Sequence, residues 1–454
     1  MNKKILMIFL SAILVFNLTP AFAFFKSNNT AQNKIEPAKK LEYVNAGFFE
    51  EFQDEYLSGY IIKAVNANHN ARQASYKTME YRENIKVALG AQLPALSVGV
   101  DYLGLKIPDE GPASLFKKNN LIMPFNASWE LDLLLKNNDK RLSTKKVYEA
   151  SVEEEKAIYI ALAADVASAY FNILNLDKQI QINQCIIKNQ KEIYERNKRM
   201  LKQGVISQTE LNKQKQSLDN LTVSTDELLK QRAMLLNQLR LLIGENPDYE
   251  VKRSCIDKIS LKNNPPSSIS SDVIYARPDV LAAEKQLESA GINVKVARKE
   301  LLPTFKITGV MAFSSMYGNF FSWDGAIAAL LAGATQELFA GGRRLANLRI
   351  KKLQYEQLFE NYKQVDLNAA KEVNDALLIS KYDYNIYEKT FNNNCLEAGN
   401  FEMTKNKYSR GTINTIELLN RQNDLFALNK ELASKKTDNL VDLITLYKAV
   451  GGQL

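Results

Sequence analysis

The residues most able to do chemistry are few and scattered along the chain. The 454-residue sequence has one histidine, His69, and three cysteines, Cys185, Cys255 and Cys395. His69 lies in a polar segment without Cys or acidic neighbours at the spacing of metal ligands, which argues against a metal or general-base role. The cysteines are odd in number and widely spaced, so neither a disulfide framework nor a metal cluster is expected.

Other residue types give no stronger sign of catalysis. Ser and Asp are plentiful, but no serine sits in a nucleophile elbow. Gly341–Arg344 stands at a predicted helix start, and two glycines followed by two arginines can bind an anion. We favour a strand-to-helix joint, because the first half has Asn137–Arg141 in the equivalent place. No catalytic residue, cofactor or metal site is predicted, and the chain is not expected to be an enzyme.

Two glycines 207 positions apart, Gly204 and Gly411, organise the rest of the sequence. The same offset pairs Gly244 with Gly451, so we interpret the chain as an internal duplication. Each of the first two glycines lies near the middle of a long tract rich in good helix formers. Each half is therefore predicted to contain a hairpin of two long helices that folds at its glycine.

The placement of proline supports very long helices. No proline falls between Pro124 and Pro247, or after Pro303. Proline costs about 3 kcal/mol in a helix interior, so these tracts permit uninterrupted helices. At about 1.5 Å per residue, Arg141–Lys202 would form a rod of roughly 90 Å. A structural coiled-coil protein would show the same propensities, so the helices alone do not choose a function.

Strand-like segments precede each helical tract; three of them alternate, and the last is an Ala- and Leu-rich stretch. They are Leu96–Tyr102 and Phe125–Asp132 in the first half, and Phe305–Phe313 and Ala326–Phe339 in the second. Period two over about ten residues is typical of membrane β-barrel strands, although a soluble four-stranded sheet would show it too. Four strands cannot close a barrel, and an open edge in lipid leaves backbone groups unpaired. A membrane sheet would therefore need several protomers, and three would supply twelve strands.

Residues 1–23 have the pattern of a cleaved secretory signal. Lys3 and Lys4 precede the apolar run Ile5–Phe16, and the segment ends with alanines in a small-x-small arrangement. A retained anchor is the alternative, but the run is shorter than the ~20 residues needed to span a membrane. No lipid anchor is expected, because the first cysteine is Cys185. Removing the two lysines lowers the net charge from +8 to +6. Since acids are interleaved throughout, no nucleic-acid binding is expected.

Together these features resemble the TolC-like outer membrane factor family, the exit ducts of tripartite efflux pumps and type I secretion systems. The resemblance runs from about residue 50 to the C-terminus, and it is closest to members that serve resistance-nodulation-division pumps. Many of those members are lipoproteins, and this chain departs from them in lacking a lipidation cysteine. The resemblance is carried by Ala127–Leu133, Val166–Tyr170, Ala276–Glu284, Leu302–Pro303, Leu338–Arg343 and Leu446–Gly452.

The resemblance implies a mixed α and β membrane protein that works as a homotrimer. Four amphipathic strands per protomer would form a shared 12-stranded β-barrel in the outer membrane, continued by a long α-helical barrel through the periplasm. The implied division is a signal peptide at 1–23, a first repeat at 24–250, an equatorial linker at 251–277 and a second repeat at 278–454. Each repeat would hold a helix, two strands and a hairpin. The implied partners are a periplasmic adaptor protein, an inner-membrane transporter and outer membrane lipid.

The resemblance also implies roles for residues near the two glycines. Gly204–Val205 and Gly411–Thr412 match the tip turns that the adaptor engages at the periplasmic end. Glu210 and Glu417 match acidic positions just past the tips, where a solvated helix face is the alternative. Tyr408 matches a tyrosine that in the family bonds across to the first hairpin, and its bond to a carboxylate would latch the closed state.

The remaining gate residues depart from the family in charge. Asn420 stands where an aspartate is common, and Ile413 and Asn423 stand where relatives often carry arginine. An apolar gate packed by Ile416 and Leu419 is the alternative to a polar one. The function predicted is the outer membrane channel of a tripartite efflux pump, a passive, gated exit duct for drugs or other small molecules. The alternatives are the outer membrane component of type I protein secretion, or a structural periplasmic coiled-coil protein.

Overall fold

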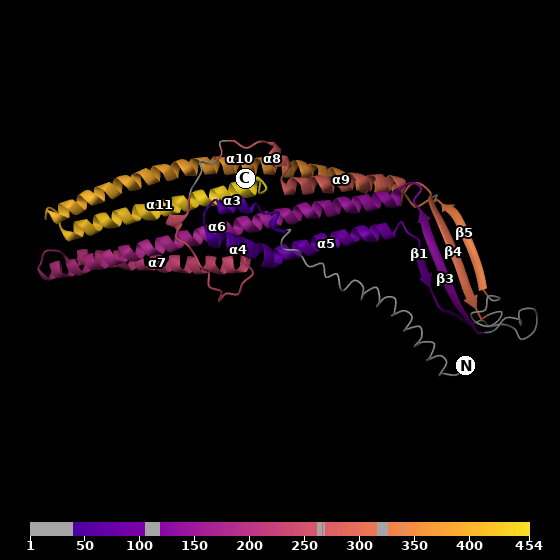
Figure 1. Ribbon diagram of the computed structural model, residues 1–454, viewed down its shortest axis with the longest axis horizontal. Coiled ribbons are helices and arrows are strands. Elements are labelled where there is room, and N and C mark those ends of the chain that lie inside the picture. Colours follow the sequence, from indigo (N-terminus) through magenta and orange to yellow (C-terminus); the bar gives the residue numbers. More distant parts are fainter. Residues whose placement is uncertain (1–39, 105–118, 261–265, 267, 316–325, 338) are drawn as a thin grey trace, which may run out of the picture.

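The chain forms a long rod with a β-sheet at one end and the turns of two helical hairpins at the other (Figure 1). The predicted signal peptide, residues 1–23, lies outside the residues that the structure describes. The computed structural model describes residues 40–104, 119–260, 266, 268–315, 326–337 and 339–454.

Two helices of equal length run along the rod. They are α6 (Lys136–Lys202) and α10 (Arg343–Ser409), each of 67 residues, or about 100 Å at 1.5 Å per residue. The helices α7 (Gln208–Leu242) and α11 (Thr415–Ala449), each of 35 residues, fold back along them. Each second-half helix begins 207 residues after its counterpart, since 343 follows 136 and 415 follows 208 by that number. The predicted helical hairpins are confirmed.

Two helices of 22 residues complete the half of the rod nearest the sheet, α5 (His69–Gly90) and α9 (Pro278–Lys299). Near the sheet α6 packs against α5 and α9, and towards the tips it packs against α7 and α11. In the same way α10 packs against α9 and then α11. The pairs α7 with α5 and α11 with α9 therefore act as two interrupted helices, and the body is a layer four helices wide.

Matching side chains close the two joints where these short helices meet. Asn68, the N-cap of α5, donates from Nδ2 to the carbonyl of Leu242 in the last turn of α7 at 2.9 Å. Arg277, which precedes α9, donates from Nη1 to the carbonyl of Ala449 at the end of α11 at 2.6 Å. Both bonds satisfy a carbonyl that a helix C-terminus leaves without an internal partner.

The largest hydrophobic core lies at mid-length, where α4 and the segment after α7 pack on α6. Here Phe48 stacks on Tyr447 with ring centroids 4.6 Å apart, and the Tyr170 hydroxyl donates to Asp54 at 2.9 Å. An apolar window of α6 is long enough to cross a membrane, but 67% of it is buried in the structure, as expected of a core helix. The shorter helical elements are α3 (Ala46–Glu50), α4 (Glu55–Ala67), the 3-10 turn η2 (Ile256–Lys258) and α8 (Asp272–Tyr275).

The sheet is antiparallel, and its order is β1–β3–β4–β5 with β2 also paired to β3. β1 and β2 continue one register along β3 and form a single strand interrupted at Gly99 and Val100. Among the described residues, β5 and the β1–β2 strand are the two free edges. The strands overlap the predicted segments, but β3 begins six residues before Phe125 and β5 ends four residues before Phe339. Their bounds are β1 Ala95–Val98, β2 Asp101–Gly104, β3 Asn119–Leu131, β4 Thr304–Ser314 and β5 Ala326–Thr335.

Candidate functional site

Both hairpins reverse at a glycine with left-handed backbone. Gly204 has φ of 73° and Gly411 has φ of 74°. The N–H of the next residue, Val205 or Thr412, donates to the carbonyl five residues back at 2.9 or 3.0 Å, as in a Schellman motif. A Cβ at either glycine would meet nothing within 4 Å, so the backbone conformation alone calls for glycine. The turns lie at the predicted positions, and Val205 and Thr412 are exposed on them.

The two predicted gate carboxylates occupy equivalent places at the start of the returning helices. The N–H of Glu210 donates to Ser207 Oγ at 3.2 Å, and the N–H of Glu417 donates to Asn414 Oδ1 at 2.8 Å. A Ser or Asn cap followed three residues later by Glu is a helix-start signature, and the helix dipole favours an acid there. Both side chains are exposed, so the structure gives each a local role in starting its helix.

The other predicted gate residues do not form the expected bond between the hairpins. The Tyr408 hydroxyl lies 3.2 Å from Thr415 Oγ1, on the same hairpin and not the first one, because the last turn of α10 faces the first turn of α11. Asn420 is exposed, Ile416 is half-buried, and the neighbouring Leu419 is buried. Near this tip, the gate candidates on the inner side of the hairpin are therefore apolar.

A polar cluster that the sequence analysis missed joins the two hairpins between α6 and α11. Asn189 donates from Nδ2 to Gln422 Oε1 and to Asn423 Oδ1, both at 3.0 Å. Further from the tips, Lys430 Nζ donates to Asn183 Oδ1 at 3.3 Å, and burial lowers the pKa of Lys430. We call these five residues the amide cluster. Asn423 thus bridges the hairpins without a charge.

At the other end of the rod, one face of the sheet is apolar along its length. Side chains alternate between the faces of a strand, so the register assigns each residue to one face. Leu96 is 82% exposed and Leu330 is 77% exposed, so this face is open on both edge strands. Exposed apolar area of this extent marks a surface that meets lipid or protein. The larger side chains of the apolar face are Leu96, Val98, Tyr102, Phe125, Trp129, Phe305, Ile307, Met311, Phe313 and Leu330.

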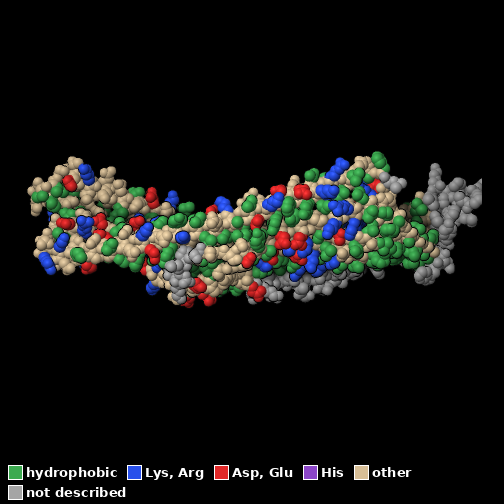
Figure 2. Space-filling view, turned by 90° about the horizontal axis from the view of Figure 1, so that it is seen from above, with side chains coloured by type: hydrophobic (Ala, Val, Ile, Leu, Met, Phe, Trp, Pro, Cys, Tyr) green, Lys and Arg blue, Asp and Glu red, His purple; other side chains and the backbone are tan. Residues whose placement is uncertain are grey.

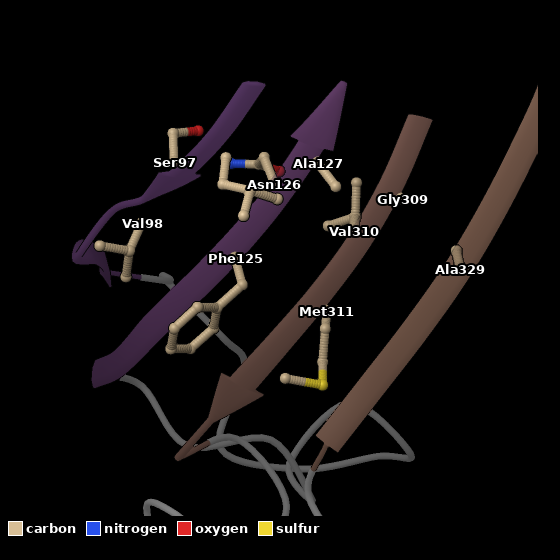
Figure 3. Close-up of a pocket in the computed structure, with 10 residues that line it drawn as sticks. Ser97, Val98, Phe125, Asn126, Ala127, Gly309, Val310, Met311 and Ala329 are labelled. Atoms are coloured by element: carbon tan, nitrogen blue, oxygen red, sulfur yellow. The ribbon is translucent and has the colours of Figure 1, made fainter. Parts of the chain in front are cut away.

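The opposite face carries polar side chains on β1, β3 and β4, and the exposed apolar Ile327 and Leu331 on β5. A hollow of about 470 Å³ lies against the sheet. Ser97, Asn126, Val310 and Ala329 form the single row of the register that lines this hollow on all four strands (Figure 3). The two neighbouring rows, which belong to the apolar face, also line the hollow on β1, β3 and β4. The face opposite the apolar one also holds Ser128, Glu130, Lys306 and Thr308.

The joints between strands and long helices correct one sequence-based equivalence. Gly342, which precedes α10, has φ of 78°, and its counterpart before α6 is Leu135, with φ of 55°. The counterpart of the glycine pair is therefore not Asn137–Arg141, which lies inside α6. In the first half Asp132 caps the helix by accepting the N–H of Asn137 at 2.9 Å and of Asn138 at 2.7 Å.

The two arginines at the second joint are matched by an acid of the chain itself. Arg343 and Arg344 lie 3.3 and 3.1 Å from the carboxylate of Glu337. At the first joint Lys136 lies 2.5 Å from Glu130 in the equivalent arrangement. The geometry supports the interpretation of a strand-to-helix joint over an anion site.

The described residues offer no arrangement for catalysis or metal binding. No group of three or more His, Cys, Asp or Glu side chains is close enough to hold a metal ion in the described part of the chain. Cys185, Cys255 and Cys395 are free and exposed, and His69 is the first residue of α5. The features that stand out are instead two helical tips, a polar contact between hairpins and a two-faced sheet.

Comparison with known proteins shows which family has this combination of features. The chain matches the outer membrane efflux protein family over residues 61–245 and 269–452. It is 25% identical over 446 residues to the cation efflux system protein CusC of Escherichia coli O157:H7, covering 95% of this chain and 94% of that protein. It is 23% identical over 417 residues to the toluene efflux pump outer membrane protein TtgF of Pseudomonas putida, covering 88% and 84%.

Solved structures share the fold. The Campylobacter jejuni CmeC outer membrane channel superimposes with a TM-score of 0.80 at 21% identity, covering 90% of this chain and 88% of that one. A crystal structure of CusC superimposes with a TM-score of 0.76 at 24% identity, covering 88% and 93%.

Proposed function

The chain belongs to the outer membrane efflux protein family, whose members are transport channels of the outer membrane that extend into the periplasm, and we propose that it is the outer membrane channel of a tripartite efflux pump. In this proposal it works with a periplasmic adaptor protein and an inner-membrane transporter that supplies the energy. The channel itself is a passive, gated duct.

The observation that carries the proposal is the two-faced sheet with two free edges. Its apolar face suits lipid, and the polar side chains of the other face suit a water-filled lumen. Backbone groups of a free edge cost several kcal/mol each in lipid, so the edges must pair with other strands. Three protomers that join β5 of one to the β1–β2 strand of the next would close a twelve-stranded barrel.

The helical body supports the same assembly. Its layer is four helices wide, with α10 at one side and the interrupted α7–α5 helix at the other. Three layers joined side by side would make a twelve-helix tube below the barrel. The equal spacing of the helices supports two repeats, at 24–250 and 278–454, around a linker at 251–277. The named cargoes of the relatives are cations and toluene, and we propose small molecules as the cargo here.

Gating is assigned to the tips. We propose that Gly204–Val205 and Gly411–Thr412 meet the adaptor, and that Glu210, Tyr408, Ile416, Glu417 and Asn420 line the constriction. The amide cluster would hold the two hairpins of one protomer together in the closed state, since its partly buried bonds join α6 to α11. Opening is a shift between two packings of the hairpins, and it needs no covalent chemistry.

Cysteine cross-linking between strand edges tests the assembly. The three native cysteines are exposed and can be replaced by Ser. Ser97→Cys on β1 is then combined, one at a time, with cysteines at positions 327 to 333 on β5. We expect oxidised membranes to give covalent trimers for some of these pairs, while Ser97→Cys alone stays monomeric on denaturing gels. Monomers for every pair would contradict the shared barrel.

A further inference from the structure

The positive charge of the chain is concentrated beside the sheet. We count charges over the 14 residues of each of α5, α6, α9 and α10 that lie nearest the sheet. These four segments together hold 16 Lys and Arg and 6 Asp and Glu. The 14 residues of each of α6, α7, α10 and α11 nearest the tips together hold 10 Lys and Arg and 8 Asp and Glu. We call the first set the basic collar, and Figure 2 shows a group of its Lys and Arg beside the sheet. The collar consists of residues 77–90, 136–149, 286–299 and 343–356.

Acids at the joints do not cancel this charge. Asp132, Glu300 and Glu337 lie between the collar helices and the strands. They reduce the excess of ten cations to seven, which exceeds the net +6 that the whole chain carries without Lys3 and Lys4. The rest of the chain is therefore close to neutral, and the charge asymmetry runs along the rod.

Part of the collar is exposed and without an acidic partner. Lys295 and Arg298 on α9 are exposed, and Arg349 and Lys352 are exposed in the single chain on α10, the side of the layer that the next protomer would join. Among the ion pairs of the described residues, none involves these four side chains. The two cations on each helix are three residues apart, so they share one face of that helix. Because α9 is flanked by both α6 and α10, a further protomer would not add beside it, and its exposed face stays open.

An aromatic residue marks the level of the collar relative to a bilayer. Trp129 lies on the apolar face, near the end of β3 that leads into α6, and its indole N–H donates to the carbonyl of Gln92 at 2.9 Å. Tryptophan with one polar and one apolar side is enriched at the headgroup level of membranes. The collar begins a few residues beyond Trp129, with Lys136. Its cations therefore lie at the headgroups of the leaflet that faces the helical body.

We propose that the basic collar binds the phosphate groups of anionic phospholipids in the periplasmic leaflet of the outer membrane. The proposal rests on the proposed function, because it requires the sheet to lie in that membrane. Clusters of Lys and Arg next to a membrane segment attract anionic lipids, and the attraction fades over a Debye length of about 8 Å at physiological ionic strength. The tips, a rod's length away, do not take part.

The test measures lipid enrichment around the full-length protein in vesicles. Trp323→Phe leaves Trp129 as the one tryptophan of the two in the chain. The protein is reconstituted in phosphatidylethanolamine with a trace of phosphatidylglycerol or phosphatidylethanolamine that carries the dansyl group on an acyl chain, which leaves the headgroup charge unchanged, and energy transfer from Trp129 is recorded. We expect about threefold enrichment of the anionic probe, lost in about 1 M salt.

The variant combines Lys295→Gln, Arg298→Gln, Arg349→Gln and Lys352→Gln. We expect the two probes to give nearly equal transfer in it. The matched control removes four exposed cations at the tips with the same change of charge, and it should keep the enrichment. The control carries Lys191→Gln, Lys198→Gln, Lys202→Gln and Lys407→Gln.

Conductance of the same samples separates this proposal from the channel proposal. Enrichment that is absent from the parent protein, or unchanged in the collar variant, overturns lipid binding even if the trimers conduct. A change in anion selectivity of the pore without a change in enrichment also overturns it, because the cations then face the lumen. Enrichment that depends on the collar in a protein that never conducts supports lipid binding and contradicts the channel.

Discussion

The joints between the short helices make a prediction with a built-in control. Gly244 and Gly204 have left-handed backbones with φ of 72° and 73°, and both follow the end of a long helix. A Cβ at Gly204 would meet nothing within 4 Å. A Cβ at Gly244 would lie 2.9 Å from the carbonyl oxygen of Ala67 and 3.0 Å from its Cβ. Gly204→Ala and Gly244→Ala, made as separate variants, therefore introduce the same backbone strain, and only Gly244→Ala adds a steric clash.

The structure sets the size of each effect. Left-handed backbone costs an alanine roughly 1 to 2 kcal/mol, and this applies to both variants. Overpacking adds about 1 to 3 kcal/mol at Gly244→Ala, because the atoms it meets belong to backbone that Asn68 ties to α7. The expected losses of unfolding free energy are thus about 1 to 2 kcal/mol for Gly204→Ala and about 2 to 5 kcal/mol for Gly244→Ala.

Thermal unfolding of the full-length protein in detergent, followed by far-UV circular dichroism, measures the difference. Large membrane proteins unfold irreversibly, so the midpoints are compared at one scan rate. For a chain this long, 1 kcal/mol corresponds to about 2 °C. The second half offers a repeat of the comparison, since a Cβ at Gly451 would lie 3.0 Å from Pro278 and one at Gly411 would meet nothing. Equal shifts for the tip and joint variants would refute the tight end-to-end joint.

Three further predictions concern polar contacts. Arg277 is 6% exposed, and its guanidinium binds the C-terminus of α11 and two carboxylates. Arg277→Gln should therefore lower the free energy of unfolding, measured with a chemical denaturant, by about 2 to 4 kcal/mol. A loss below ~1 kcal/mol would contradict that role. Asn189→Leu leaves Gln422 and Asn423 without their partner in the amide cluster, so the resting conductance in planar bilayers should rise. An unchanged conductance would show that the cluster does not hold the gate closed. Burial and the neighbouring Asp383 raise the pKa of Asp442 to about 7, so the folded state holds a proton between about pH 4 and pH 7 that the unfolded state has lost. The stability from this proton falls as pH rises through that window, and Asp442→Asn should raise the unfolding midpoint more at about pH 8 than at about pH 5; an equal change at both would contradict the raised pKa.

The elements of this fold could be predicted because their signals are local. A tract without proline permits a helix wherever it lies, and a Gly after a helix followed by a capped start, as at Gly204 and Ser207, marks a reversal. Alternation marks strands in the same way. The break between β1 and β2 has a cross-strand cause instead: Gly99 donates its N–H to the carbonyl of Pro124 at 2.9 Å, but Pro124 has no N–H to return the bond.

The contacts between elements could not be predicted in the same way. Asn68 and Arg277 look like ordinary polar residues in sequence, and their roles depend on helix ends that lie far away in the chain. The amide cluster depends on α11 packing beside α6, which no periodic pattern states. Tyr408 was assigned a partner on the first hairpin, but the nearer Thr415 competes for its hydroxyl.

The strand-to-helix joint shows a different limit. The sequence analysis used Gly341–Arg344 to place the joint, because glycine commonly takes left-handed backbone. In the first half the same conformation is taken by Leu135, which carries no such sign. The sequence analysis therefore paired the glycines with residues inside α6, a few positions after Leu135, although it predicted the strand-to-helix joint itself.

Electrical recording tests the central claim most directly. The protein is purified from the outer membrane fraction as a trimer that dissociates on heating, and it is added to a planar lipid bilayer. The account predicts discrete single-channel steps from the trimer and none after it is dissociated by heat. A soluble monomer that never produces conductance would contradict an outer membrane efflux channel.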